Sequence, residues 1–310
     1  MRASPVLSVK TYGATFSVFF ANQMGIDWRA AYVAMLDELN IRNIRIPVYW
    51  NLVEPTADQF DFTDTDWMVR EAEKRQANVI LAIGQKLPRW PECHISGWAR
   101  NLQADVYQKQ LLRYIARVVE RYRDSPAVKI WQVENEPFLN FGECPPLNEK
   151  LLDAEIAAVR AISAQPIMIT DSGELSYWVP SHKRADVFGS TLYRIIWSPI
   201  LGNFTYPLPA SFFRIKRSLA ELFDKPKPAV VIELQAEPWQ HKMLYETATE
   251  DQLKIMNPDK FRETLAYASQ TGFDTFYLWG VEWWYWLKTK HNMPAMWDTV
   301  KTAVQSVSAK

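Results

Sequence analysis

The sequence predicts a single (β/α)8 barrel, in which eight parallel strands alternate with helices. Eight short β-branched or apolar runs occur along the chain, amphipathic segments lie between them, and no linker or low-complexity tract interrupts the alternation. The chain has 310 residues, and a closed barrel typically uses about 250 residues as one unit. The pattern therefore fits one closed barrel over residues 1–310 better than an open doubly wound sheet.

The expected strands are runs of five to eight residues. They cover residues 14–19, 43–49, 78–84, 128–134, 166–170, 186–193, 229–234 and 274–280. Short apolar runs of this kind are typical of strands buried on both faces of a parallel sheet. In a barrel, the carboxyl ends of all the strands meet at one mouth, where functional residues concentrate.

Amphipathic segments with helical periodicity separate these strands. They cover residues 27–40, 65–77, 105–123, 148–163 and 259–272, with a weaker pattern over 174–185. Asp27, Thr65 and Asp105 stand where a side chain can cap the first turn of a helix. Asn40 and Gly272 stand where a left-handed residue can end one.

Composition excludes several classes of function. Lys plus Arg and Asp plus Glu both number 35, so no basic excess favours nucleic acid. No long apolar stretch predicts membrane association, and the start "MRASPVLSVK" lacks the apolar core of a signal peptide. We therefore expect either a cytoplasmic protein or a secreted form whose signal has been removed. Only 10 glycines are present, which disfavours phosphate-cradling loops, and no cofactor is expected.

Two cysteines leave the redox chemistry open. Cys93 and Cys144 each follow a strand, and the two strands are expected to be neighbours, so a disulfide and two free thiols are both compatible with the sequence. Cys93 and His94 lack further ligands at usable spacing, so no metal site is predicted. Serine-based hydrolysis is excluded because the G-x-S-x-G elbow is missing.

Glutamates end two strands that are expected to face each other across the barrel mouth. Residues 131–137 read "WQVENEP", and residues 231–238 read "VIELQAEP". Retaining glycosidases hold two carboxyl groups about 5–5.5 Å apart, whereas inverting enzymes separate them by about 6.5–9.5 Å. A single glutamate at a strand end is ordinary, but a facing pair indicates glycoside hydrolysis.

The stretch "WQVENEP" resembles the strand-four signature of the clan A glycoside hydrolases, retaining β-glycosidases built on TIM barrels. Its "QVENE" is similar to the β-galactosidases of families 35 and 42, whereas the size of the bare barrel is similar to families 5 and 10. Residues 49–84, together with "KLPRWPE" at 86–92, resemble the second and third βα units of the clan.

The resemblance implies roles for particular residues. It makes Glu136 the acid/base, Asn135 the donor to the sugar 2-hydroxyl and Glu233 the nucleophile. It also makes Tyr193 a hydrogen-bond partner of the nucleophile and Arg45 a buried positive group beside it. Positive neighbours would keep Glu233 ionised, while a drier setting would raise the pKa of Glu136.

Other strand-end residues are predicted to bind substrate. Trp279 would be the platform beneath the sugar, and Trp90, Glu237 and Glu282 are further candidates. Glu237 remains an alternative nucleophile, but Glu233 is preferred because it lies where the apolar run stops. Glu134 has the same parity as Glu136, so an extended strand would point both side chains the same way.

Ten of the 14 tryptophans are expected at or after strand ends. They are Trp50, Trp90, Trp98, Trp178, Trp197, Trp239, Trp279, Trp283, Trp284 and Trp286. Indole rings stack on the apolar faces of sugars, although about half of these rings are expected to pack within loops instead.

The sequence thus predicts one catalytic domain, a monomer or weak oligomer, that hydrolyses β-linked neutral oligo- or polysaccharides by double displacement. The alternative is a carbohydrate-binding barrel that has lost catalysis. Gln85, where some clan members have histidine, and the unfamiliar "ELQAEPW" leave the identity of the sugar open.

Overall fold

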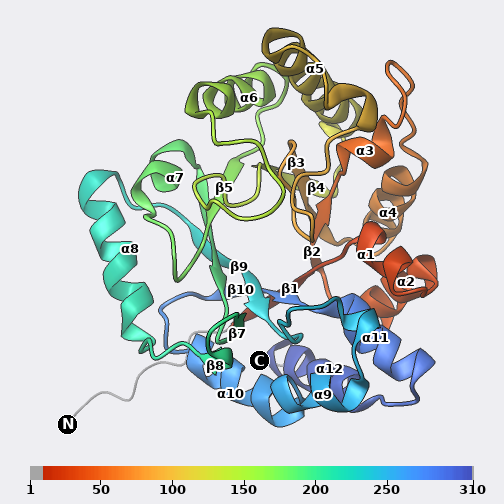
Figure 1. Ribbon diagram of the computed structural model, residues 1–310, viewed down its shortest axis with the longest axis vertical. Coiled ribbons are helices and arrows are strands. Elements are labelled where there is room, and N and C mark those ends of the chain that lie inside the picture. Colours follow the sequence, from red (N-terminus) through yellow and green to blue (C-terminus); the bar gives the residue numbers. More distant parts are fainter. Residues whose placement is uncertain (1–9, 309–310) are drawn as a thin grey trace.

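Eight parallel strands close into a barrel in the computed structural model, which describes residues 10–308 (Figure 1). They are β1 (Thr11–Thr15), β2 (Asn43–Pro47), β3 (Asn78–Ile83), β4 (Val128–Val133), β5 (Ile167–Asp171), β6 (Val187–Leu192), β9 (Ala229–Gln235) and β10 (Thr275–Trp279). Strand β1 pairs with both β2 and β10, which closes the ring. The predicted (β/α)8 barrel is confirmed.

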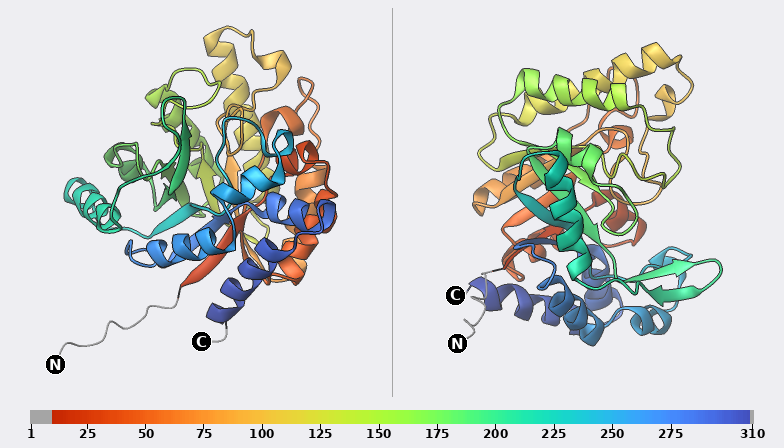
Figure 2. Two further views of the ribbon diagram at one scale, coloured as in Figure 1. Left: turned by 60° about the horizontal axis from the view of Figure 1, so that its bottom comes forward. Right: turned by 90° about the vertical axis from the view of Figure 1, so that its left-hand side faces the viewer.

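Helices surround this barrel (Figures 1 and 2). The α-helices are α1 (Val18–Gln23), α2 (Trp28–Asp37), α3 (Trp50–Val53), α4 (Thr63–Lys74), α5 (Ala104–Tyr122), α6 (Glu149–Ile162), α7 (Val179–Arg184), α8 (Ser211–Phe223), α9 (Thr249–Ile255), α10 (Pro258–Ala268), α11 (Val281–Lys290) and α12 (Ala295–Ser308). Two short 3-10 helices are η1 (Gly97–Ala99) and η2 (Leu244–Glu246).

The ends of several elements follow from local side-chain chemistry. Asp27 caps α2 by accepting hydrogen bonds from two backbone amides, as predicted. Asn40 and Gly272 have φ angles of 57° and 88°, which confirms the left-handed conformation expected after α2 and α10. The first strand lies earlier than the predicted 14–19, because Ser17 accepts a hydrogen bond from the Phe20 amide and begins α1.

Two predicted caps are wrong. Helix α4 begins at Thr63, which places Thr65 inside its first turn, and α5 begins at Ala104, which places Asp105 there. Neither helix has a side-chain hydrogen bond at its cap. Acidic residues still occupy both first turns, where the helix dipole favours negative charge.

The interior of the barrel is packed with side chains. Ile80, Met168, Ile232 and Tyr277 form a buried cluster contributed by four strands. A Cβ atom on Gly189 would lie 2.8 Å from the Thr170 side chain and 3.3 Å from Ile232, so a larger residue would disturb this packing. Because the interior is filled, a ligand can enter only at the mouth.

A hairpin that the sequence analysis did not predict stands between β6 and β9. Its strands, β7 (Ile195–Ser198) and β8 (Gly202–Thr205), pair with each other in antiparallel fashion. The hairpin projects from the body of the barrel in the right-hand view of Figure 2. Gln235, at the end of β9, accepts hydrogen bonds from the amides of Arg194 and Ile195 and so fixes its base.

A disulfide joins Cys93 to Cys144, with 5.2 Å between the Cα atoms. It ties the loop after β3 to the loop after β4, which settles the question the sequence left open. No helix within residues 10–308 is long and apolar enough to cross a membrane. The inference about a signal peptide concerns the extreme N-terminus, of which residues 1–9 lie outside the described part of the chain.

Replacing both cysteines with serine is expected to lower the free energy of unfolding by about 2–4 kcal/mol, because the bridge restricts the unfolded chain. Denaturant titration would measure the change. Counting thiols under denaturing conditions, with and without reductant, provides the check on the bond itself. Two reactive thiols without reductant would show that the bridge does not form.

Candidate active site

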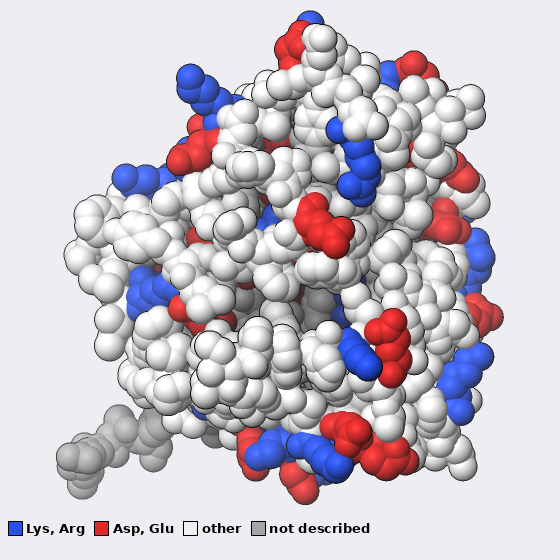
Figure 3. All heavy atoms as spheres, in the orientation of Figure 1, with Lys and Arg blue, Asp and Glu red and all other residues white. Residues whose placement is uncertain are grey.

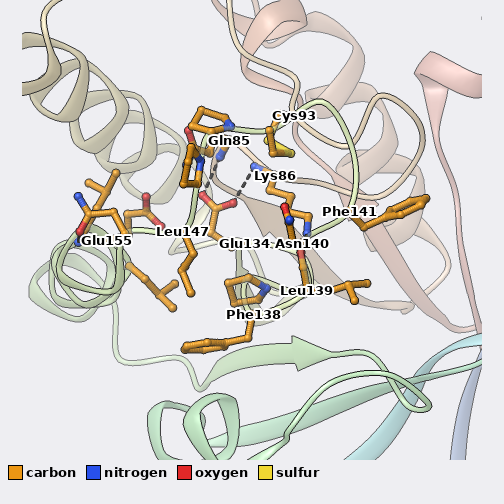
Figure 4. Close-up of a pocket in the computed structure, with 17 residues that line it drawn as sticks. Gln85, Lys86, Cys93, Glu134, Phe138, Leu139, Asn140, Phe141, Leu147 and Glu155 are labelled. Carbon is orange, nitrogen blue, oxygen red and sulfur yellow. Dashed lines mark hydrogen bonds between the residues drawn. A yellow bond between two sulfur atoms is a disulfide. The ribbon is translucent and has the colours of Figure 1, made fainter.

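The two glutamates after β4 face different spaces. Strand β4 ends at Val133, and Glu134 and Glu136 then adopt left-handed conformations with φ angles of 57° and 45°. Glu134 lines a small pocket beside the disulfide (Figure 4), whereas Glu136 lines the main cavity at the barrel mouth. The expectation that both side chains point the same way is wrong, because the chain is no longer extended there.

Glu134 is held by the loop after β3. Its carboxylate accepts hydrogen bonds from the backbone amides of Gln85 and Lys86, at 2.8 and 2.6 Å (Figure 4). The carboxyl of Glu155, from α6, lies next to that of Glu134. Burial raises the pKa of both carboxyls. A Cβ atom on Gly84 would lie 2.3 Å from the Glu134 carboxylate, so glycine permits this close approach.

The main cavity has a volume of about 780 Å³, within the range typical of ligand sites. Glu136, Glu233 and Glu237 all line it. Near the centre of the face viewed in Figure 3 the surface is hollowed, and uncharged residues make up most of the rim. The strand-end glutamates at 136 and 233 are thus brought to one cavity, three positions apart in the ring of strands.

Glu233 is held in place by positive and hydroxyl groups. Arg45 Nη1 lies 2.6 Å from one carboxylate oxygen, and the Tyr193 hydroxyl donates to the other at 2.8 Å. Arg45 is fully buried, and its other nitrogens donate to the side-chain oxygens of Gln132 and Asn135, each at 2.7 Å. The residues expected around Glu233 therefore lie together.

Glu136 has a contrasting environment. The Thr191 hydroxyl donates to its carboxylate at 3.0 Å, and none of the ion pairs among the described residues involves Glu136. Burial, followed by the nearby charges of Glu233 and Glu92, holds the pKa of the Glu136 carboxyl well above its usual range. The Glu136 carboxyl is thereby set to carry a proton, whereas the Glu233 carboxylate is bound by a guanidinium.

Arg89 forms a second charged centre in the cavity. Its guanidinium pairs with Glu237 and lies 2.6 Å from Glu282. It also stacks between Phe20 and Trp279, at 3.9 and 4.0 Å from the ring centroids. Glu282 is fully buried, so it holds Arg89 and does not face the cavity, and Arg89 covers one face of Trp279.

Aromatic rings line the outer part of the cavity. Trp90, Trp197, Trp239 and Trp279 border it, and Trp90 is 42% exposed. Phe141, from the disulfide-linked loop, contacts the rings of both Trp90 and Trp239. The other predicted tryptophans pack elsewhere, and they are Trp50, Trp98, Trp178, Trp283, Trp284 and Trp286.

Sequence reasoning missed Arg89 and Glu92, which both line the cavity. They belong to the stretch "KLPRWPE", of which only Trp90 was predicted to bind substrate. Both have positive φ angles, 85° and 72°, and non-glycine residues with such angles tend to cluster at functional sites. The available signal was a pair of charged residues, Arg89 and Glu92, on either side of "WP" in a loop after a strand.

Comparison with known proteins gives the family. Residues 9–199 match the model of the cellulase family, glycosyl hydrolase family 5. The chain belongs to this family. The match confirms the resemblance to clan A and places this family 5 protein among the glycoside hydrolases, and the family supports a retaining glycosidase.

Individual proteins similar to the family 5 chain have low sequence identity to it. The β-galactosidase Bga of Halorubrum lacusprofundi is 27% identical over 128 residues, which are 36% of this chain and 18% of that protein. A β-galactosidase structure from Bacillus circulans sp. alkalophilus has a TM-score of 0.59 at 15% identity, covering 88% of this chain and 51% of the other. The chain thus spans about half the length of that β-galactosidase.

An endo-β-1,4-xylanase of family 10 from Gloeophyllum trabeum matches over nearly its whole length. The TM-score is 0.60 at 14% identity, and the alignment covers 97% of both chains. At such low identity, these structural likenesses show that the family 5 barrel shares its fold with these enzymes. They assign no substrate to it.

The free energy of unfolding of the family 5 protein is expected to fall as the pH rises. Replacing Glu155 with glutamine is expected to make this fall smaller. The raised pKa of the Glu134 and Glu155 carboxyls means that the folded state holds protons more tightly than the unfolded state. Their contribution is therefore complete below the ordinary pKa of 4.5 and is lost as the pH rises through the higher folded values. Chemical unfolding measured between about pH 4 and pH 8 would compare the slopes, and equal slopes in both proteins would contradict the assignment.

Proposed function

We propose that this protein is a retaining β-glycosidase that hydrolyses β-linked neutral oligo- or polysaccharides with two glutamates. Glu136 is the acid/base and Glu233 the nucleophile. The observation that carries the proposal is the presence of both carboxyls in one cavity with opposed surroundings: the Glu233 carboxylate is paired with Arg45, whereas the Glu136 carboxylate forms no ion pair within the described chain. We also propose that the barrel acts as one catalytic domain.

In the first step, the Glu233 carboxylate attacks the anomeric carbon while Glu136 gives its proton to the departing glycosidic oxygen. The bond to the aglycone breaks, and a glycosyl ester forms on Glu233. In the second step, Glu136 takes a proton from water, whose oxygen attacks the same carbon and releases Glu233. Two inversions leave the anomeric configuration unchanged.

Neighbouring groups support this division of roles. The Tyr193 hydroxyl and Arg45 both bind the Glu233 carboxylate and thereby stabilise the ionised nucleophile and the leaving carboxylate of the second step. The Asn135 side-chain oxygen accepts from Arg45, so its amide nitrogen is the group left to donate to the sugar 2-hydroxyl. Neutral sugars suit a cavity whose arginines are already paired with glutamates.

The competing nucleophile, Glu237, is less suited to attack. Both terminal nitrogens of Arg89 donate to its carboxylate, and it follows the end of β9 in a loop. Glu233 lies within β9 and is the largest charged influence on Glu136, whereas Glu237 is not among the leading influences. We therefore retain Glu233 as the nucleophile and assign Glu237, with Trp90 and Trp279, to substrate binding.

Alanine substitution separates these roles. On 4-nitrophenyl β-glycosides, Glu136→Ala is expected to lower kcat by about 10²–10⁴-fold, the usual contribution of a general acid or base. Glu233→Ala is expected to lose more, and azide is expected to rescue it with inversion at the anomeric carbon. Release of nitrophenol and the configuration of the azide adduct are the measurements.

Two outcomes would contradict this assignment. An active Glu233→Ala with an inactive Glu237→Ala would exchange the nucleophiles. Binding of oligosaccharides without cleavage of any glycoside would favour a non-catalytic carbohydrate-binding barrel.

The pH profile tests the protonated state of Glu136. Activity is expected to fall as the pH rises through the raised pKa of Glu136, because the departing oxygen then lacks its proton donor. The leaving group of 2,4-dinitrophenyl glycosides needs no protonation. With these substrates, the rate of the first step in the Glu136→Ala variant should no longer fall at alkaline pH. Pre-steady-state release of dinitrophenol measures that step, and an unchanged fall in the variant would assign it to another group.

A further inference from the structure

Glu92 is a carboxyl in the cavity that the proposed mechanism does not use. It lies in the loop between β3 and η1, lines the cavity with Glu136 and Glu233, and is 8% exposed. The sequence pattern predicts no role for it. Its surroundings define what it can bind.

The backbone around Glu92 is fixed from several sides. Its amide donates to the Arg89 carbonyl at 2.8 Å, and its carbonyl accepts from the Leu87 amide at 2.7 Å. The next residue, Cys93, is held by the disulfide. A Cβ atom on Gly142 would lie 2.5 Å from the Glu92 Cβ, so the opposing loop also packs closely against it. The carboxyl is therefore presented from a rigid support.

The Glu92 carboxyl has few protein partners. Oε2 accepts one long hydrogen bond, 3.3 Å from Asn135 Nδ2, and no partner for Oε1 is found among the described residues. No ion pair of Glu92 is found within 4.0 Å in the same part of the chain. By contrast, Glu233 and Glu237 each have an arginine. A nearly buried carboxyl with an open hydrogen-bonding position fits a polar ligand group.

The charge around Glu92 favours a neutral ligand group. The ionisable groups that act on it or respond to it are Arg45, Tyr49, Lys86, Glu136 and Glu233. Burial and the charge of Glu233 raise the pKa of Glu92 to about 8. At neutral pH its carboxyl therefore carries a proton for most of the time, and it can both donate to and accept from a hydroxyl.

We propose that Glu92 binds the 3-hydroxyl of the sugar in the catalytic cavity and makes that hydroxyl a requirement of the reaction. This inference rests on the proposed function, in which Asn135 binds the 2-hydroxyl. Because Glu92 touches Asn135 Nδ2, a sugar oxygen on that nitrogen places its ring neighbour beside Glu92. The neighbours of C2 are the reacting anomeric carbon and C3, so the adjacent hydroxyl is the one on C3.

Gln85 does not compete for this position. It stands soon after β3, but its backbone amide binds Glu134, its side-chain oxygen accepts from Tyr107, and it lines the small pocket of Figure 4. Gln85 is not among the residues of the catalytic cavity. Recognition from this side of the site is thereby left to the later part of the same loop, which carries Glu92.

The experiment compares substrates that lack one hydroxyl. The probes are the 4-nitrophenyl β-glycoside that the wild type cleaves fastest and its 2-deoxy and 3-deoxy analogues. Glu92→Ala is expected to lower kcat/KM on the parent and 2-deoxy glycosides by about 10- to 100-fold and on the 3-deoxy glycoside by less than about 3-fold. Glu92→Gln, which still donates and accepts, should lose less than Glu92→Ala on the parent.

The matched control is Glu143→Ala, which removes an exposed carboxyl from the neighbouring disulfide-linked loop. It should leave kcat/KM unchanged on all three substrates. Thermal unfolding of each variant verifies folding. An equal loss by Glu92→Ala on the three glycosides would show a structural role, and a loss that disappears only with the 2-deoxy glycoside would move the contact to C2. Either result, or no loss at all, overturns the inference.

Variants of the catalytic pair distinguish failure of the two proposals. If Glu136→Ala and Glu233→Ala keep full activity, the proposed function fails. If they lose activity while Glu92→Ala shows no preference among the three glycosides, only the role of Glu92 fails. If the wild type cleaves no aryl glycoside, both proposals fail together.

Discussion

The candidate site depends on one buried cation. The Arg45 side chain is fully buried at the base of the cavity, where its nitrogens bind Glu233 on β9 and Gln132 and Asn135 on β4 and just beyond it. A guanidinium so deep in the protein is tolerated only when its donors are satisfied, and its planar shape fixes the directions of its partners. Strands β2, β4 and β9 are thereby held in one arrangement, which fixes the positions of Glu136 and Glu233.

Around this centre, the protein keeps several carboxyls close together by giving each a different environment. Glu233 and Glu237 are neutralised by separate arginines, while Glu134 receives two backbone amides and adjoins Glu155. Glu136 relies on burial and a threonine hydroxyl. Differences in partners, at short separations, allow neighbouring glutamates to hold different protonation states at one pH.

Much of this arrangement could be predicted from sequence, because it depends on pattern. Apolar runs of strand length mark the barrel, and the glutamates follow from where two runs stop. The division between Glu134 and Glu136 could not be predicted, since both residues have a left-handed backbone and their partners are distant in sequence: the Gln85 and Lys86 amides bind the Glu134 carboxylate, and the Thr170 hydroxyl binds the Glu136 amide. The place of Arg89, between two rings and two carboxylates, likewise depends on tertiary contacts alone.

The β7–β8 hairpin shapes the rim of the cavity but is not part of the barrel that carries the two glutamates. The hairpin strands pair only with each other among the described strands, and Trp197 of β7 lines the cavity. Insertions or deletions at the tip would reshape the rim without shifting the register of any barrel strand. Descendants of this chain could therefore diverge in the outline of the cleft while Glu136 and Glu233 keep their places.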